Sequence, residues 1–414
     1  MFTATDLKQL SRLGITSEQV QQQLKNFRKG FPFLSIVASA TLQKGIIQVN
    51  KARQGELIAC YEKWNGSRLK FVPASGTADD DSPKWLLKFH KYPKGARTAL
   101  EEHLVEAAMY AKDTDNVARL HFTIFPEHRS EFKKLLKKVQ KDYEKRFGVQ
   151  FEFNFSEQKK STDIIVTDEE NKPFRNTDGS LLFRSGGHGA LLENLNDIQE
   201  DIVFIKNIDN VVLDAYKEET AKWEKILAGM LLQLQKQIGN YIAAMESGEA
   251  SVDFYEIGQF LETNFCVTHS HTFDSEEEYE TWLYKKLNRP LRVCGVVKNV
   301  SEHREIPFIV KNKDGTHSLQ IVESVQINMK KDMQKLANAT HFNPVDLVCS
   351  FRDYKGGKFD LRQFSNPATG FISTRNEEGK IFKTQELPGL WNGAMSDWNT
   401  MFVEVPPDTF LYIQ

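Results

Sequence analysis

The chain has 414 residues, which is longer than one hydrophobic core usually supports, so two or three packed units are expected. Its hydrophobic fraction of 40%, charged fraction of 27% and net charge of −2 give no electrostatic case for binding nucleic acid or an anionic membrane. The sequence has no signal-peptide pattern, no apolar run of membrane length and no Cys-x-x-Cys pair among its four cysteines. We therefore expect a cytoplasmic protein with no nucleic-acid or membrane partner.

The first 65 residues are predicted to be mostly helical. Thr16 with Gln19 forms a capping-box pattern, and Gly30 is placed to end the helix that follows. No pattern that indicates chemistry occurs in this segment. We interpret residues 1–65 as a helical extension that packs on the next domain.

The first candidate site lies where an apolar strand over residues 68–73 runs into small residues. Backbone N–H groups around Ser75, Gly76 and Thr77 could surround phosphate oxygens. Strand ends are commonly small and glycine-rich, so an ordinary loop is an equal alternative. Lys84 follows closely and would place a mobile positive charge beside the same loop, where a triphosphate would need it.

Strands and helices alternate over the next part of the chain. The pattern predicts a helix over 99–111, a strand over 119–125, a helix between Ser130 and Gly148, and a strand over 150–155. Such alternation indicates an α/β sheet of mainly parallel strands.

Residues 185–192 place three glycines around His188 at the start of a predicted helix. A flat ring could lie against the bare backbone there, with N–H groups free to bond it. An ordinary loop histidine is the alternative. A metal role is less favoured than either, because no acidic or cysteine side chain stands beside His188.

Asp209 is the first candidate for a metal ligand. The apolar run over 202–205 stops soon before Asp209, which is flanked by amides, and this predicts a buried strand that delivers polar groups at its carboxyl end. Ligands bind at that end of an open parallel sheet, and Mg²⁺ commonly takes one or two carboxylates plus substrate phosphates. For an Asp-Asn pair considered alone, an ordinary turn is the preferred alternative.

The second half of the chain is predicted to mix long helices with strands. A single apolar stripe predicts a packed helix over 216–245, followed by helices over 252–264 and from Ser275. Strands are predicted over 291–297 and 319–327. The remainder is turn-dense and strand-like.

The order of these segments resembles the sugar-nucleotide pyrophosphorylases, in particular the UDP-sugar and UDP-N-acetylhexosamine branch. The motifs that carry the resemblance are short and share the family's order: Ala74-Ser75-Gly76-Thr77 with Pro83-Lys84, Ser156-Glu157-Gln158, Asp178-Gly179, Gly186-Gly187-His188-Gly189, Ile208-Asp209-Asn210, Cys294-Gly295-Val296-Val297, Asp314-Gly315 and Ile321-Val322-Glu323. Residues 71–76, 186–192 and 388–395 also resemble an uncharacterised bacterial family, a domain of unknown function classed with this fold.

The resemblance implies a Rossmann-like, mainly parallel sheet of the nucleotide-diphospho-sugar transferase type. It covers the chain from about residue 66 onward and implies a nucleotidyltransferase-like domain over residues 66–345. Residues 1–65 would then be a helical N-terminal extension, and residues 346–414 a small β-rich C-terminal part.

The resemblance also implies an activity, in which Mg²⁺-dependent transfer moves a nucleoside monophosphate, uridylyl in this branch, from a nucleoside triphosphate to a sugar-1-phosphate with release of pyrophosphate. In the roles that the resemblance implies, Asp209 binds Mg²⁺, Lys84 stabilises the β and γ phosphates, and Ser75, Gly76 and Thr77 surround these phosphates. Gln158, Gly187 and His188 face the base, and Gly295 and Glu323 face the sugar.

Three departures from the family pattern bear on activity. The pyrophosphorylases place an arginine after Gly76-Thr77, whereas this chain has Ala78 followed by three aspartates. Many bacterial relatives have lysine where this chain has Ser324, and the strand over 399–405 lacks the lysine that binds phosphate in the UDP-sugar branch. Candidate replacements for the missing charges are Arg97, Lys206 and Lys383.

Two alternatives to an active nucleotidyltransferase therefore stay open. One is a catalytically inactive protein that binds a nucleotide or nucleotide sugar. The other is a glycosyltransferase of related fold, which is less favoured because no Asp-x-Asp motif occurs at the metal strand.

Overall fold

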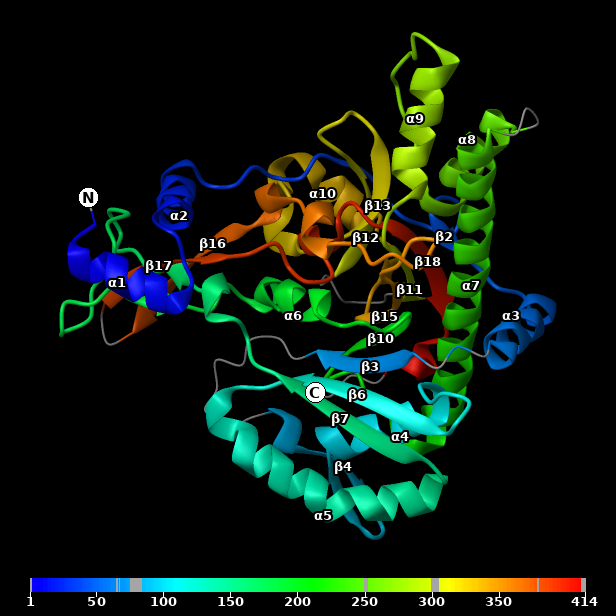
Figure 1. Ribbon diagram of the computed structural model, residues 1–414, viewed down its shortest axis with the longest axis horizontal. Coiled ribbons are helices and arrows are strands. Elements are labelled where there is room, and N and C mark those ends of the chain that lie inside the picture. The colour runs from blue at the N-terminus through cyan, green and yellow to red at the C-terminus, as the bar shows by residue number, and fades with distance from the viewer. Residues whose placement is uncertain are drawn as a thin grey trace.

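A central sheet of nine strands runs through the part of the chain that the structure describes (Figure 1). The structure is a computed structural model that describes residues 2–64, 66, 68–74, 84–248, 252–298, 305–377 and 380–410. The strand order is β2-β18-β11-β15-β10-β3-β6-β7, with β14 paired to β11. These strands are β2 (Ile46–Ile47), β3 (Leu69–Ala74), β6 (Val117–Thr123), β7 (Gln150–Ser156), β10 (Ile202–Asn207), β11 (Leu291–Lys298), β14 (His341–Phe342), β15 (Asp346–Ser350) and β18 (Asn399–Val405).

The sheet is mainly parallel, as the sequence predicts. β15 is antiparallel to both of its neighbours and β14 is antiparallel to β11, whereas the other pairings are parallel. Strands from all three predicted regions take part, because β2 comes from residues 1–65 and both β15 and β18 come from residues 346–414. The predicted divisions after residues 65 and 345 therefore do not coincide with a boundary between sheets.

Smaller sheets surround the central one. β12 pairs with β1 and β13 in a three-stranded sheet, and three two-stranded hairpins complete the described strands. Their bounds are β1 (Ile36–Ser39), β12 (Ile306–Lys311), β13 (His317–Val322), β4 (Lys88–Tyr92) with β5 (Gly95–Thr98), β8 (Ile164–Ile165) with β9 (Phe183–Arg184), and β16 (Phe371–Glu377) with β17 (Lys380–Glu386). The N-terminal region, predicted to be mostly helical, thus also supplies strands β1 and β2.

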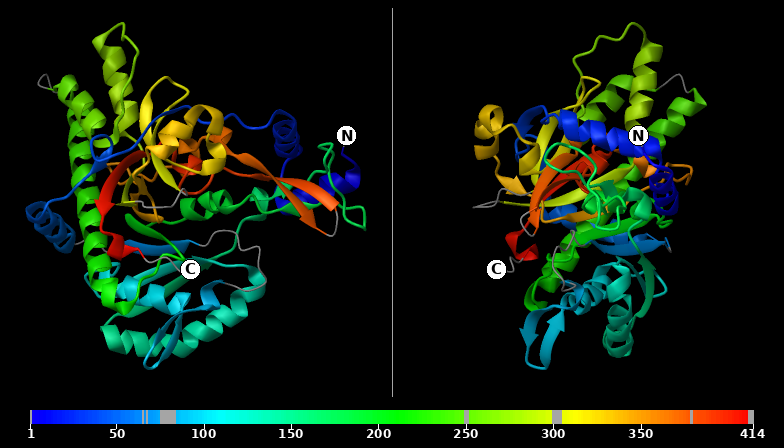
Figure 2. Two further views of the ribbon diagram at one scale, coloured as in Figure 1. Left: turned by 180° about the vertical axis from the view of Figure 1, so that it is seen from behind. Right: turned by 90° about the vertical axis from the view of Figure 1, so that its left-hand side faces the viewer.

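Helices cover the central sheet, and α7 runs along one side of it (Figures 1 and 2). The described helices are α1 (Ala4–Leu13), α2 (Ser17–Lys29), α3 (Lys51–Lys63), α4 (Ala99–Tyr110), α5 (Arg129–Phe147), α6 (Leu192–Asn196), α7 (Asp214–Ser247), α8 (Phe254–Phe265), α9 (Glu276–Leu287) and α10 (Met329–Ala337). Within the described residues, every helix is too short or too polar to cross a membrane.

Alternation along β10 separates two hydrophobic cores. Phe204 points into the core shared with α3, α4, α5 and α7, whereas Val203 and Ile205 point into the core shared with α6 and the 390–398 segment. Successive side chains of a strand face opposite sides of a sheet, so a continuous apolar run serves both cores. This double burial explains why the run over 202–205 contains no polar residue.

The helix ends follow the local sequence signals. The Thr16 hydroxyl accepts a hydrogen bond from the Gln19 backbone N–H, and the Gln19 side chain accepts one from the Thr16 backbone N–H. Gly30 caps the end of α2. Thr98 and Glu101 form the same reciprocal capping box at the start of α4. α4 directly follows β5, and the N–H of its first residue, Ala99, donates to the Leu87 carbonyl at 3.1 Å, which joins the start of α4 to the segment that begins at Lys84.

Candidate functional site

The carboxyl ends of four neighbouring strands meet along one edge of the central sheet. β10, β3, β6 and β7 are mutually parallel, so their last residues lie on the same side. Asp209 follows β10 by two residues, and Gln158 follows β7 by two residues. This is the edge at which open α/β sheets bind their ligands.

Lys84 and Asp209 form an accessible ion pair at this edge. Lys84 opens a short 3₁₀ helix, η1 (Lys84–Leu86), and its Nζ lies 3.1 Å from Asp209 Oδ2. The two side chains are 39% and 45% exposed. From the sequence we expected both residues near a triphosphate, but not in contact with each other. In the structure they are in contact although they lie 125 positions apart in the chain.

The donor set around Asp209 fits a cation that arrives with a phosphate ligand. The described residues contain no group of three or more His, Cys, Asp or Glu side chains that could hold a metal ion. A single exposed carboxylate is a common protein contribution to Mg²⁺ bound mainly through substrate phosphates. Asp209 therefore suits a metal shared with a nucleotide better than a resident metal.

The expected phosphate loop lies mostly outside the described residues. Ser75, Gly76 and Thr77 belong to the segment over 75–83, which the structure does not describe. The preceding strand is described through Ala74, whose carbonyl accepts a 2.8 Å hydrogen bond from the Ile208 N–H. Ala74, the last described residue before this segment, therefore lies beside the strand end that carries Asp209.

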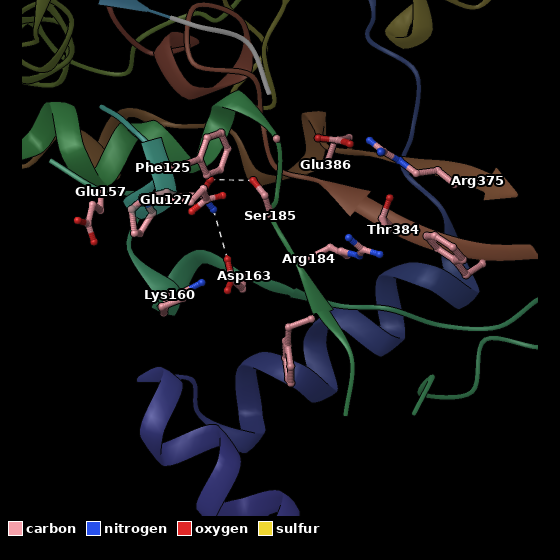
Figure 3. A pocket seen from close by; sticks show the side chains of 15 residues that line it. Phe125, Glu127, Glu157, Lys160, Asp163, Arg184, Ser185, Arg375, Thr384 and Glu386 are labelled. Carbon is pink, nitrogen blue, oxygen red and sulfur yellow. Dashed lines mark hydrogen bonds between the residues drawn. The ribbon is translucent and has the colours of Figure 1, made fainter. Parts of the chain in front are cut away.

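Gln158 and Gly187 line a pocket of about 430 Å³ next to this edge. Figure 3 shows this pocket, with Glu127, Asp163 and Ser185 among the side chains around it. Gln158 Oε1 accepts from Ser185 Oγ at 2.8 Å, and its amide donates to Asp163 Oδ1 at 3.3 Å. Burial raises the pKa of Asp163, although Lys160 opposes the shift. The pocket walls are Phe125, Pro126, Glu127, Glu157, Gln158, Lys160, Asp163, Phe183, Arg184, Ser185, Gly187, Arg375, Phe382, Thr384 and Glu386.

The glycines around His188 accommodate protein rather than open space. Gly187 has φ +78°, and a Cβ there would lie 1.9 Å from Glu386 Oε2. A Cβ on Gly189 would lie 2.1 Å from the Pro388 carbonyl oxygen. The 386–388 segment therefore lies directly beside these two glycines, and the expected contact of a flat ring with their backbone stays a prediction.

His188 lies beside Glu323, so the structure joins a residue expected on the base side to one expected on the sugar side. The His188 ring stacks on Trp391 with centroids 4.4 Å apart, and Nδ1 accepts from the Leu390 N–H at 3.0 Å. Nε2 lies 3.6 Å from Glu323 Oε1. Burial opposes protonation of His188, but the carboxylates of Glu323, Glu305 and Glu386 together raise the pKa of the ring.

Gly295 lies within β11 and faces the packed interior. A Cβ there would meet Val405 at 3.4 Å and Leu227 at 3.5 Å, and its carbonyl accepts from Asn343 Nδ2 at 2.7 Å. Its expected role toward a sugar stays a prediction.

Two residues that sequence reasoning missed complete the group around Glu323. Asn392 Nδ2 donates to Glu305 Oε2 at 2.6 Å, and Asn392 Oδ1 is buried with no hydrogen-bond partner among the described residues. Burial, followed by the nearby Glu323 carboxylate, raises the pKa of Glu305. The two glycines that flank the 390–392 segment were the sequence signal for Asn392, whereas no local pattern indicates that Glu305 is half-buried.

The three candidate replacement charges are bound elsewhere. Arg97 holds Asp214 with two contacts of 2.6 and 2.8 Å, and Lys206 Nζ lies 2.6 Å from Glu106 Oε2. Lys383 Nζ donates to the Glu169 carbonyl at 2.8 Å. None of these three therefore takes the place of the missing arginine or the missing late lysine in this structure.

The mixed α/β fold with its mainly parallel sheet is similar to the fold of the UDP-sugar pyrophosphorylases. The chain is similar to UDP-N-acetylglucosamine pyrophosphorylase from Trypanosoma brucei, with a TM-score of 0.54, 11% identity and coverage of 95% of this chain and 70% of that chain. It is also similar to a putative UDP-N-acetylglucosamine pyrophosphorylase from Entamoeba histolytica, with a TM-score of 0.51, 13% identity and coverage of 91% and 81%. At these identities the likeness shows the fold alone.

The chain belongs to the family described as a domain of unknown function (DUF4301), which matches residues 3–80 and 80–413. The two matched segments meet at residue 80, inside the acidic segment that departs from the pyrophosphorylase pattern. No curated protein matches the chain significantly.

Proposed function

We propose that this protein transfers a nucleoside monophosphate, uridylyl by the resemblance, from a nucleoside triphosphate to a sugar-1-phosphate and releases pyrophosphate. The observation that carries the proposal is the Lys84–Asp209 pair, with its 3.1 Å contact at the ligand-binding edge of the sheet. One cationic and one anionic side chain, both partly exposed, are what a phosphate group with its metal ion requires there.

The reaction needs alignment and charge neutralisation more than covalent catalysis. An oxygen of the sugar-1-phosphate forms a bond to the α-phosphorus, and the bond from that phosphorus to the oxygen bridging the α and β phosphates breaks. Pyrophosphate leaves with the bonding electrons. Lys84 stabilises the β and γ phosphates, and Ser75, Gly76 and Thr77 surround them.

Asp209 is the residue that would hold Mg²⁺. It offers one accessible carboxylate, which is a common protein contribution to Mg²⁺ bound mainly through substrate phosphates. The ion, when bound, supplies positive charge to the phosphate oxygens. Gln158 and Gly187 line the pocket assigned to the base, with His188 next in the chain, while Glu323 and Gly295 are assigned to the sugar.

The test is pyrophosphate release from each nucleoside triphosphate with Mg²⁺ and a pool of sugar-1-phosphates. We expect release with one triphosphate, and its loss in Asp209→Ala while the circular dichroism spectrum is unchanged. Asp209→Asn is the matched variant, because it keeps the side-chain volume and removes the charge. Turnover that Asp209→Ala leaves unchanged would remove the metal assignment.

A specific observation favours a second candidate, a nucleotide or nucleotide-sugar binding protein without catalysis. The expected arginine is replaced by Ala78 and three aspartates, and Arg97, Lys206 and Lys383 are bound to other groups. Such a protein would gain thermal stability with a ligand yet release no pyrophosphate. A melting-temperature rise with UTP or a UDP-sugar, without turnover, would select this candidate.

A further inference from the structure

His103 is enclosed directly behind the Lys84–Asp209 pair. It lies in α4, is fully buried, and its Nε2 is 3.0 Å from the Ile208 carbonyl oxygen. The same ring packs against the Trp85 ring with centroids 5.9 Å apart. Ile208 precedes Asp209 and Trp85 follows Lys84, so one imidazole contacts a chain neighbour of each member of the pair.

The chemistry of this contact fixes the histidine in one form. A carbonyl oxygen only accepts, so Nε2 carries the proton and donates it to Ile208. Burial lowers the pKa of His103 to about 4, and the ring is therefore neutral at physiological pH. Nδ1 has no hydrogen-bond partner among the described atoms, so the hydrogen bond from Nε2 is the one that the ring makes with them.

Both neighbours of the pair are otherwise immobilised. Trp85 is 5% exposed and packs edge-on against Phe122 at 5.2 Å and Phe132 at 6.0 Å. On the other side, Ile208 is fully buried and its N–H donates to the Ala74 carbonyl at 2.8 Å. His103 is thus the contact that connects two fixed segments.

We propose that His103 is a positioning residue that sets the placement of Asp209 relative to Lys84. A core histidine that merely fills space is the competing explanation. The two explanations make different predictions, because only the positioning role depends on the N–H donor at Nε2 of His103. The catalytic consequence rests on the proposed function, whereas the geometric claim does not.

The first test measures the pair without any ligand. Asp209→Cys places a thiol at the strand end, and a nearby lysine increases thiolate formation and therefore alkylation. The rate of iodoacetamide reaction at pH 7 is followed by mass spectrometry of the peptide that contains residue 209. Adding Lys84→Met should slow this reaction several-fold, which calibrates the contribution of the lysine.

Three further variants are then placed in the Asp209→Cys background. His103→Leu removes the donor and should abolish most of the lysine-dependent acceleration, whereas His103→Gln keeps a donor near Nε2 and should retain it. Tyr110→Phe is the control, because it removes a different polar group from the same helix, the hydroxyl that donates to Glu106 at 3.1 Å. Urea unfolding confirms that each variant is folded, and His103→Phe replaces His103→Leu if the latter is not.

Equal reaction rates in the His103→Leu and parent proteins would overturn the proposal, as would a Lys84→Met change that leaves the parent rate unaltered. With native Asp209 and active protein, His103→Leu should lower kcat about tenfold, the size expected for one lost buried hydrogen bond, with KM little changed. His103→Gln should restore most of that loss. If no variant or parent releases pyrophosphate, the proposed function fails while the alkylation result still decides the role of His103.

Discussion

The strand β10 serves two lysine–carboxylate pairs that differ in burial. Lys206, near its end, is 1% exposed and lies 2.6 Å from Glu106 Oε2, which is equally buried. Asp209, two residues beyond the strand, meets Lys84 at 3.1 Å with both side chains at least 39% exposed. Burial alone would lower the pKa of Lys206, but the Asp346 and Glu106 carboxylates raise it, so the inner pair stays charged.

This difference in burial indicates which of the two pairs is accessible to a ligand. The inner pair has lost its water and depends on its partners, so its charges are committed to the fold. The outer pair is screened by solvent, and opening it to admit a phosphate costs little. Similar chemical groups are therefore buried in the fold in one place and accessible to a ligand in the other.

The largest effect should come from breaking the inner pair. Lys206→Met leaves the Glu106 carboxylate buried without its nearest cation, and we expect a loss of about 3–5 kcal/mol in the free energy of unfolding, measured by urea denaturation. The double variant Lys206→Met/Glu106→Gln removes both charges and should recover much of this loss. A single variant as stable as the parent would show that the inner pair does not support the fold.

A pH experiment should give the next largest effect. The pKa of His103 falls from 6.5 to about 4 on folding, so its contribution to stability is complete above pH 6.5 and is lost as the pH falls toward 4. We expect His103→Gln to remove about 3 kcal/mol of this acid destabilisation. His121, whose pKa is also about 4, remains in the variant and should keep part of the pH dependence. Parallel stability curves for parent and variant would contradict this prediction.

An intermediate effect is expected for Arg97, whose burial lies between the two pairs. Its guanidinium is 11% exposed and holds the partly exposed Asp214 with two contacts. Arg97→Lys keeps the charge but loses the paired geometry, and we expect a loss of about 1–2 kcal/mol in unfolding free energy. In an Asp214→Asn background the same change should have much less effect, and equal losses in both backgrounds would exclude a direct interaction.

The smallest stability effect is expected at the outer pair. Lys84→Met and Asp209→Asn should each change the free energy of unfolding by no more than about 0.5 kcal/mol, because exposed ion pairs contribute little. The same variants should abolish turnover if the proposed function holds. A stability loss comparable to that of Lys206→Met would instead make the outer pair part of the structural framework.

The sequence predicted the elements that depend on local signals. The apolar run before Asp209 became β10, and the alternating helices and strands between residues 99 and 156 lie close to their predicted places. Lys84 lies at the carboxyl-end edge of the sheet, whereas its expected place beside the phosphate loop stays a prediction because residues 75–83 lie outside the described part of the chain. The predictions of these helices and strands succeed because apolar periodicity, capping residues and strand ends depend on a few neighbouring residues.

What the sequence could not provide is pairing over long separations. Lys206 occurs in an apolar run with nothing nearby to indicate its partner, which lies 100 positions earlier. Glu102, His103 and Glu106 recur on one side of a helix that is otherwise largely apolar, a pattern that indicates burial only in retrospect. The short strands β1 and β2 were also missed, because each is defined by a distant partner strand.

The position of β18 has a consequence for synthesis on the ribosome. β18 lies between β11 and β2, with Phe402 beside both Cys294 and Ile46. The nascent chain therefore makes β2 more than 350 residues before its partner strand emerges. Until then one edge of β11 is open, and an open apolar strand edge invites association with other chains. Closure of the sheet must therefore await the synthesis of residues 399–405, so we expect a chain that stops before β18 to depend on chaperones more than one that includes it.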